Sequence, residues 1–196
     1  KDLEQGGFIA SVECIEVRVP MSDELSRTYM NSSKRARYRL ACENPYKTDV
    51  LTALLRKHHG RRILIIGLYI NQLQQLSKKL NVPFIHGKMP NEEREELYDA
   101  FRRGEVPVLI ISKVGNFAID LPDANVAIQI SGTFGSRQEE AQRLGRILRP
   151  KSDGSTSKFY SLTSENTVDQ EYAEKRQRFL TERGYYYELV NAEQIL

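Results

Sequence analysis

The sequence predicts an α/β protein with a mostly parallel, doubly wound sheet covered by helices on both faces. Strand-length hydrophobic runs alternate along the chain with helix-length amphipathic runs. Residues 62–67 form a continuous apolar run, which is typical of a parallel strand buried on both sides. The chain has 196 residues, of which 40% are hydrophobic and 28% charged, so it can bury a substantial core. This composition excludes disordered, collagen-like and low-complexity proteins.

The first 60 residues predict one strand and two helices. Residues 8–19 alternate in hydropathy up to a proline, which predicts a strand at a sheet edge or entering the core. The Ser-Asp-Glu sequence at 22–24 predicts the start of one helix that runs towards Cys42 and ends before Asn-Pro at 44–45. The second helix has an apolar side formed by Val50, Leu51, Leu54 and Leu55.

After residue 60 the pattern predicts repeated strand–helix units. Strands are expected at residues 62–67, 82–86, 106–112, 125–131, 158–162 and 185–190. Helices are expected around Leu73, Leu76 and Leu80, and at residues 90–103, 136–148 and 167–183. Ligands of such sheets bind outside the carboxyl ends of the strands, so we expect a site in the loops after Gly67, His86, Ser112 and Ser131.

Tyr185 and Tyr187 share one face of the last predicted strand with Leu189. Two aromatic rings on a strand can stack on bases, but this spacing favours a core face instead.

Several classes of protein are disfavoured by composition. Two cysteines, Cys14 and Cys42, are too few for a disulfide scaffold and indicate a reducing compartment. Three histidines and two distant cysteines lack the spacing of a metal site, so no metal ligands are expected. The longest apolar run is too short for a membrane span, and we expect no signal peptide, because charged residues follow Lys1. Because the sequence does not begin with Met, we expect a piece of a longer protein.

Positive charge is concentrated in residues 27–62. This segment has ten Lys or Arg and two acidic residues, a net charge of +8, whereas the whole chain carries +3. Such a block is typical of a surface that binds a polyanion, usually nucleic acid, and is equally compatible with a solvated helix face. Its candidate contacts are Arg35, Arg37 and Arg39.

The strongest chemical signal is Gln-Arg-Leu-Gly-Arg-Ile-Leu-Arg at residues 142–149. On the helix predicted there, Gln142, Arg146 and Arg149 follow one another along one side. Guanidinium groups suit phosphoryl oxygens and can stabilise negative charge that develops during phosphoryl transfer. Gly145, inside this helix, costs about 1 kcal/mol relative to Ala, which indicates the close approach of another backbone or a ligand.

Residues 142–149 resemble motif VI of superfamily-2 helicases. Ile-His-Gly at 85–87, followed by Pro90 and Arg94, resembles the strand–His-Gly–helix element of their second RecA-like domain, and residues 112–120 resemble motif V. In finer detail, residues 111–115, 120–122, 141–146 and 175–180 resemble the XPB family of DNA helicases, and the resemblance spans nearly the whole chain.

The resemblance implies a RecA-like P-loop NTPase fold, with a first strand and basic helical segment at 1–45, as a thumb remnant, and the second helicase domain at 46–196. Arg146 would be the arginine finger, supported by Arg143, with Gln142 in the same cleft. Asp120 and Gly115 of motif V would face the nucleotide, although Asp120 also fits a cap or Asx-turn. Arg149 would face the nucleotide or tie the helix to its own domain.

The resemblance also implies a path for nucleic acid. Ser112 and Lys113 would hold a strand phosphate, although Lys113 also fits an exposed loop lysine. His86 and Gly87 would line the path, with Gly87 permitting a tight exit from its strand. A lone histidine such as His86 is more often structural.

Two elements of an ATPase are missing from the sequence. Gly87-Lys88 lacks the flanking residues of a Walker A loop, and Asp23-Glu24 opens a helix instead of ending a buried strand. We therefore expect ATP and Mg²⁺ to be held largely by a preceding RecA-like domain, and this chain alone to be inactive.

The predicted function is that of the C-terminal motor domain of an ATP-dependent XPB-like DNA helicase or translocase in nucleotide excision repair or transcription initiation. Its partners would be single-stranded or forked DNA, the upstream domain, and a repair nuclease or transcription complex, with no membrane. It would act in the cytoplasm or nucleoid of a microbe, or in a eukaryotic nucleus. The alternatives are a double-stranded DNA translocase of the restriction type, a non-catalytic RecA-like binding module and an RNA helicase.

Overall fold

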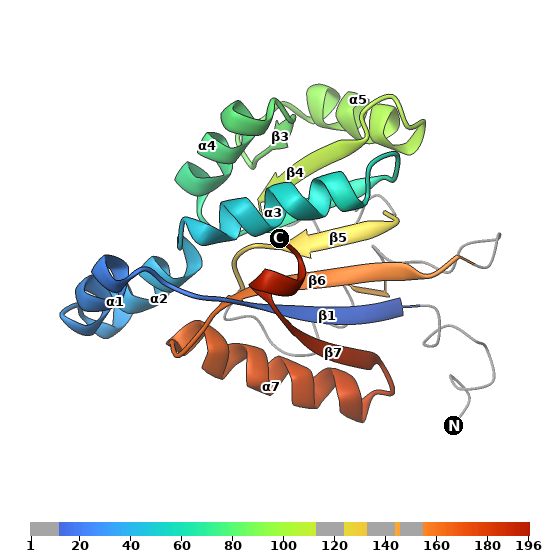
Figure 1. The fold of residues 1–196 in the computed structure, drawn as a ribbon. Helices are drawn as coiled ribbons and strands as arrows, with labels where there is room; N and C mark the ends of the chain where they lie inside the picture. The colour runs from blue at the N-terminus through green and yellow to red at the C-terminus, as the bar shows by residue number, and fades with distance from the viewer. Residues whose placement is uncertain (1–11, 113–123, 133–143, 146–154) are drawn as a thin grey trace.

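The computed structural model describes residues 12–112, 124–132, 144–145 and 155–196. Its centre is one seven-stranded sheet in the order β3-β4-β2-β5-β6-β1-β7, in which every neighbouring pair is parallel (Figure 1). This confirms the predicted fold class. The strands are β1 (Val12–Val19), β2 (Ile63–Gly67), β3 (Phe84–Ile85), β4 (Val108–Ser112), β5 (Val126–Gln129), β6 (Ser157–Ser164) and β7 (Tyr186–Asn191).

Helices cover both faces of the sheet. They are α1 (Asp23–Met30), α2 (Lys34–Cys42), α3 (Tyr46–Lys57), α4 (Ile70–Leu80), α5 (Asn91–Arg102), α7 (Val168–Glu182) and the short 3₁₀ helix η2 (Ala192–Gln194). Helices α3 and α4 share a core cluster with Ile63 and Ile65, while α5 and α7 share another with Leu64 and Ile66. Successive side chains of β2 thus enter opposite cores, which explains its continuous apolar run. None of the described helices is long and apolar enough to cross a bilayer.

Strand β1 lies inside the sheet, although it is the first described element of the chain. It pairs with β6, where Val12 faces Ser157, and with β7, where Glu13 faces Tyr186. Of the segment expected at 1–45, β1 therefore belongs to the same sheet as the later strands. Helices α1 and α2 instead project beyond the carboxyl ends of the strands, at the left of Figure 1.

The single helix predicted from residue 22 to Cys42 is wrong, because the structure has two helices there. Ser22 caps α1 as expected, accepting a hydrogen bond from the Leu25 amide at 3.1 Å. A second serine, Ser33, caps α2. The side chain of Arg37 then folds back and donates to the carbonyls of Tyr29 (3.0 Å) and Met30 (2.6 Å), satisfying the end of α1.

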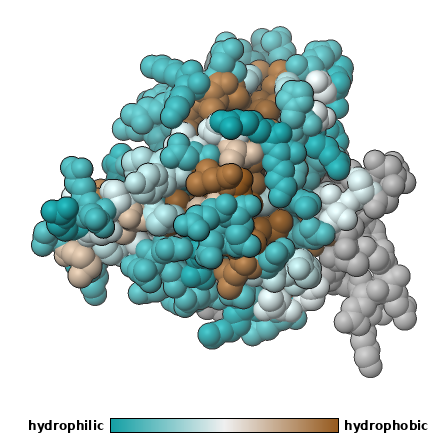
Figure 2. Space-filling view, viewed as in Figure 1, coloured by the Kyte–Doolittle hydropathy of each residue, from teal (hydrophilic) through white to brown (hydrophobic). Residues whose placement is uncertain are grey.

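The core prediction for β7 is confirmed for its tyrosines and wrong for Leu189. Tyr185 and Tyr187 pack against the cluster under α7, and the Tyr187 hydroxyl donates to Glu16 Oε1 at 2.6 Å. Leu189 is 47% exposed, because β7 is the outermost strand and has a neighbour on one side only. Figure 2 shows the other face of the molecule, on which α3 and the C-terminus lie. This face is mostly hydrophilic, with exposed apolar residues near its middle, where the chain ends.

A half-buried histidine lies near the amino ends of the strands. His58, just after α3, shares a hydrogen bond of 2.7 Å between its Nε2 atom and the Tyr160 hydroxyl. Burial, helped by the charges of Lys158, Lys57 and Arg61, lowers the pKa of His58 to about 4. The ring is therefore neutral in the folded protein at pH 7.

We expect His58 to make the fold acid-sensitive. Its pKa in the unfolded chain is about 6.5, so its contribution to stability is fully present above that pH and declines as the pH falls towards 4. Urea denaturation at pH 7.5 and 4.5 should show a smaller loss of stability for His58→Gln than for the wild type. The same change at the exposed neighbour His59 is the control, and equal acid sensitivity of all three proteins would refute the assignment.

Candidate functional site

The carboxyl ends of the central strands form a closely packed shelf. Gly67 at the end of β2 lies beside Ser112 at the end of β4, and Ser131 beyond β5 accepts a hydrogen bond from the Leu68 amide at 2.6 Å. A Cβ atom added at Gly67 would lie 2.6 Å from Leu73 Cδ2, so the buried Leu73 side chain of α4 would have to shift to admit even a methyl group there. The loops that leave this edge thus start from fixed positions.

A buried ion pair joins the two helical layers at this edge. Lys47 Nζ, in the first turn of α3, lies 2.8 Å from Asp169 Oδ2, in the first turn of α7, and both residues are almost fully buried. Lys47 Nζ also donates to the Ile130 carbonyl at 2.8 Å, and Asp169 Oδ2 accepts from the Ser164 amide at 3.0 Å. Each charge therefore has its partner and a backbone hydrogen bond, as a buried pair requires.

The end of β6 is tied to α2 through Ser164. Its hydroxyl donates to the Ala41 carbonyl at 2.6 Å and accepts from Asn44 Nδ2 at 3.1 Å. Asn44 also donates to the Pro20 carbonyl at 3.0 Å. The link between α2 and α3 is thus anchored to both β6 and the chain that leaves β1.

Side chains of α2 and α7 lie against the backbone just beyond β5. The Tyr38 hydroxyl, on α2, donates to the Gly132 carbonyl at 2.6 Å. A Cβ atom at Gly132 would lie 2.9 Å from Nη2 of Arg176, a buried residue of α7. Tyr38 and Lys47 thus hold the carbonyls of residues 132 and 130, from which the chain continues towards the segment 142–149 that resembles motif VI.

The predicted nucleic-acid residues of the central and edge strands differ in exposure. Ser112 is fully buried at the end of β4, and Lys113 lies outside the described residues. His86 is half-buried, with its ring 5.3 Å from that of Phe84. The Met89 amide donates to the His86 carbonyl at 3.1 Å, closing a turn in which Gly87 is exposed.

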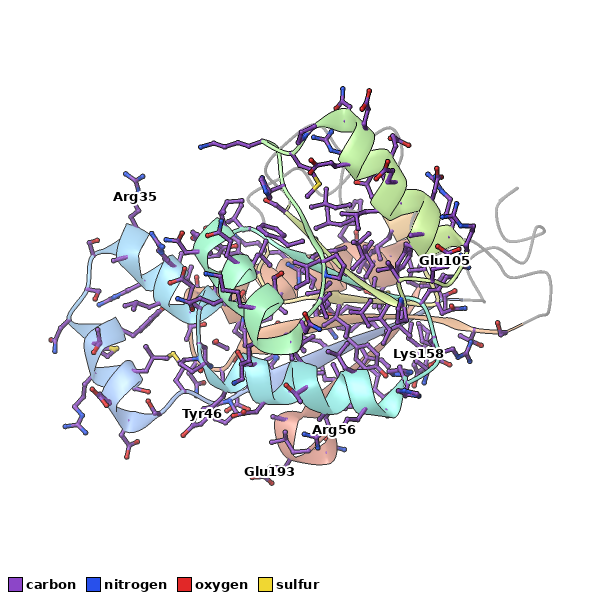
Figure 3. The ribbon with its side chains drawn as sticks, turned by 90° about the horizontal axis from the view of Figure 1, so that it is seen from above. Arg35, Tyr46, Arg56, Glu105, Lys158 and Glu193 are labelled. Atoms are coloured by element: carbon purple, nitrogen blue, oxygen red, sulfur yellow. The ribbon has the colours of Figure 1, made fainter. Side chains whose placement is uncertain are left out.

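The three predicted arginines of α2 have different surroundings. Arg35 is exposed and points away from the helix (Figure 3). Arg37 is occupied with the end of α1. Arg39 donates to Glu43 Oε1 at 3.2 Å and lies 5.2 Å from the centre of the Tyr69 ring. It also lines a groove of about 420 Å³ with Gln72 and Lys79 of α4.

The basic block of residues 27–62 does not form one surface. Lys47 is buried in the ion pair described above. Arg56 lies towards the far end of α3 from the projecting helices, and Figure 3 shows it well separated from Arg35. Arg61 and Arg62 lie further still, where β2 begins. Only the part on α1 and α2 is at the carboxyl edge, so only that part can contribute to a site there.

All of the predicted nucleotide contacts lie outside the described residues; these are Gln142, Arg143, Arg146, Arg149, Asp120 and Gly115. Two neighbours of the motif VI arginines are described. Leu144 is buried in the cluster under α5 and α7, whereas Gly145 is exposed, and a Cβ atom there would have no described atom within 4 Å. The close approach expected at Gly145 is therefore not made by the described part of this chain. That part also contains no cluster of His, Cys, Asp or Glu able to hold a metal ion.

Sequence reasoning missed the polar residues that hold this edge together. Lys47 had been counted with the basic block, and no role was assigned to Tyr38, Asp169 or Arg176. Asp169 carried a weak signal, because an acid in the first turn of a predicted helix is favoured by the helix dipole. The others acquire their roles from partners more than 40 residues away in the chain.

Solved structures of helicase domains share this fold. The C-terminal domain of the DEAD-box protein Dbp5 superposes with a TM-score of 0.70 over 93% of this chain and 92% of its own, at 18% sequence identity. The E. coli DEAD-box protein SrmB, solved with the regulator of ribonuclease activity A, gives a TM-score of 0.66 over 94% and 93% of the two chains, also at 18% identity. At such identity the likeness concerns the fold alone.

Sequence relatives are much closer. The "DNA 3'-5' helicase XPB" of Mycobacterium tuberculosis is 52% identical over this whole chain, and that of Kineococcus radiotolerans is 50% identical. The XPB/SSL2 helicase/translocase subunit of the Saccharomyces cerevisiae general transcription and DNA repair factor IIH is 39% identical over 96% of the chain. The chain spans 36%, 35% and 23% of the lengths of these relatives. The sequence model described as "ERCC3/RAD25/XPB C-terminal helicase" matches residues 3–196, so this chain belongs to the XPB family and corresponds to its C-terminal helicase domain.

Proposed function

We propose that the chain is the second motor domain of an ATP-dependent DNA helicase or translocase that acts in nucleotide excision repair or transcription initiation. Support comes from the family match over residues 3–196 and from relatives named as DNA helicases or as helicase/translocase subunits of factor IIH. Because the relatives at 50–52% identity are bacterial, we propose a microbial protein that acts on the nucleoid.

The observation that carries the proposal is the contrast between Leu144 and Gly145. Buried Leu144 ties this turn of helix to the core, while Gly145 beside it faces open space among the described residues. In the helix predicted at residues 136–148, positions two residues from Leu144 fall roughly 160° around the axis. We therefore expect Gln142 and Arg146 on the outward side, where a second domain can approach.

On this proposal, ATP binds between this domain and a preceding RecA-like domain that provides the Walker A loop and the Mg²⁺ ligands. When bound, ATP with Mg²⁺ supplies the phosphoryl group that is transferred to water. Arg146 would stabilise the charge that develops at the γ-phosphate, and Arg143 and Gln142 would orient the γ-phosphate. Asp120, Gly115 and Arg149 would complete the nucleotide side of this domain.

We propose that the carboxyl edge of the sheet carries the DNA, from His86 and Gly87 beyond β3, past Lys113, which follows the buried Ser112, to Arg35 on α2. Five strand spacings separate β3 from β1, which is about 24 Å. That length corresponds to about seven nucleotides of one strand in B-form geometry. Such contacts fix position on the backbone and carry no base sequence information.

Replacing Arg146 by Ala in the full-length protein should abolish DNA-stimulated ATP hydrolysis. An arginine finger contributes about 10³–10⁵-fold to turnover and little to nucleotide binding. Steady-state hydrolysis and fluorescent-nucleotide binding should therefore separate, with hydrolysis lost and binding kept. Turnover within a few-fold of the wild type would contradict the proposal. A strand-displacement assay on the wild type then distinguishes a helicase from a translocase that keeps the duplex closed.

Gly145→Ala should lower ATP turnover without lowering the stability of the domain. Without a neighbouring atom in the described chain, the new methyl group should leave thermal stability unchanged or raise it by up to about 1 kcal/mol. ATP turnover by the full-length protein should fall, because the methyl occupies the space left for the other domain. Gly67→Ala is the contrasting control, since its methyl meets Leu73 and should lower stability. Full turnover by Gly145→Ala would show that this space is not used.

Arg35→Glu, which reverses the charge at this position, should weaken DNA binding and reduce the salt dependence of that binding. Loss of one phosphate contact lowers the slope of log K against log salt by about 1. Arg56→Glu makes the same change in charge at an exposed position distant from the carboxyl edge, so it should leave the slope nearly unaltered. Binding of full-length protein to a labelled duplex over a salt series tests this, and identical slopes for both variants would make α2 an ordinary solvated face. Arg37 is unsuitable, because its loss would also uncap α1.

A further inference from the structure

We propose that Tyr38 is a positioning residue that couples the basic hairpin of α1 and α2 to the backbone leading from β5 towards motif VI. This inference rests on the proposed motor function. It assigns one hydrogen bond, from the Tyr38 hydroxyl to the Gly132 carbonyl, as the link by which DNA bound at the hairpin affects ATP hydrolysis.

The bond connects the two regions that the proposed function requires to communicate. Tyr38 lies on α2 between Arg37 and Arg39, and its side chain turns inward and is 4% exposed. Its hydroxyl donates to the Gly132 carbonyl at 2.6 Å. Burial raises the pKa of Tyr38, so the phenol keeps the proton that it donates. Gly132 precedes Gln142 of motif VI by ten residues in the sequence.

The surroundings leave little freedom at this contact. The Tyr38 ring packs edge-on against Tyr172 of α7, with centroids 5.5 Å apart and planes at 89°. A Cβ atom added at Gly132 would lie 2.9 Å from Arg176 Nη2 and 3.4 Å from the Tyr38 hydroxyl oxygen, so both side chains lie close against this position. A shift of α2 is therefore transmitted to Gly132 instead of being absorbed by a cavity.

A second anchor two residues earlier limits how far a shift at Gly132 can travel back into β5. The Ile130 carbonyl is held by Lys47, which is itself fixed by Asp169. Lys47 belongs to α3, which packs on the core, whereas Tyr38 belongs to the projecting hairpin (Figure 1). A motion of the hairpin thus acts beyond residue 130 and leaves β5 in place.

The hairpin offers a matched control in Tyr29 of α1. The Tyr29 hydroxyl also bonds the main chain, but it accepts from the Val168 amide at the start of α7, at 2.9 Å. Tyr29→Phe and Tyr38→Phe each remove one buried hydroxyl from the hairpin. Only the second removes a contact with the chain that leads to motif VI.

The experiment measures ATP turnover by the full-length wild type, Tyr38→Phe and Tyr29→Phe, with and without saturating DNA, together with DNA affinity and melting temperature. We expect Tyr38→Phe to reduce the ratio of DNA-stimulated to DNA-free turnover by about fivefold, at the lower end of couplings between sites. Tyr29→Phe should keep the wild-type ratio. Both variants should bind DNA and melt similarly, because each removes one hydroxyl group from a buried tyrosine of the hairpin.

The outcomes separate this inference from the proposed function. No stimulation by DNA in the wild type would remove the proposed function and the inference with it. Stimulation in the wild type with an unchanged ratio for Tyr38→Phe would overturn the inference alone. Equal losses of the ratio in both variants would also overturn it, since the hairpin would then act only through its general stability. A selective loss in Tyr38→Phe, with DNA affinity retained, supports the coupling.

Discussion

The buried ion pair between Lys47 and Asp169 is the constraint on which the arrangement of this domain depends. It joins the first turn of α3 on one face of the sheet to the first turn of α7 on the other, and Lys47 also donates to the Ile130 carbonyl just beyond β5. Removing one partner of such a pair leaves an uncompensated buried charge, at a cost of about 3–5 kcal/mol. Apolar contacts hold each helix to its own face, but they do not fix the two layers relative to each other at the edge where the loops emerge.

With that edge fixed, the charged residues divide into structural and available groups. Lys47, Arg37 and the buried Arg176 are engaged with the protein itself, whereas Arg35 points to solvent. A count of positive charges along the sequence therefore overestimates the surface that a polyanion meets. Exposed arginines far from the edge, such as Arg56, still contribute to the general attraction of DNA at low salt.

Much of the fold could be predicted from the sequence, because the signals for it are local. The apolar run at 62–67 and the amphipathic pattern around Leu73 and Leu76 correspond to β2 and α4. The break between α1 and α2 was not predicted, although Asn31, Ser32 and Ser33 carry a local signal for it, because Asn and Ser favour helix caps and turns over helix interiors. The roles of Lys47 and Tyr38 depend on partners 122 and 94 residues away, and no local pattern reports such distances. The motif VI arginines were proposed from resemblance, and they remain predictions.

The position of β1 has a consequence for how this chain is made. Val12, the first residue of β1, pairs with Ser157, 145 positions later, and the other edge of β1 pairs with β7, which is made later still. At about 5–20 residues per second of synthesis, the first strand emerges roughly 7–30 s before its earliest partner. During that interval two unpaired strand edges and the apolar side chains of Val17 and Val19 face the solvent. Strands β2 to β5 can meanwhile pair among themselves, because they are close in the sequence. The pairing of β1 with β6 and β7 joins residues much further apart in the sequence, so this half of the sheet has the higher contact order. Its formation is the slow step, and until then the nascent chain is exposed to aggregation.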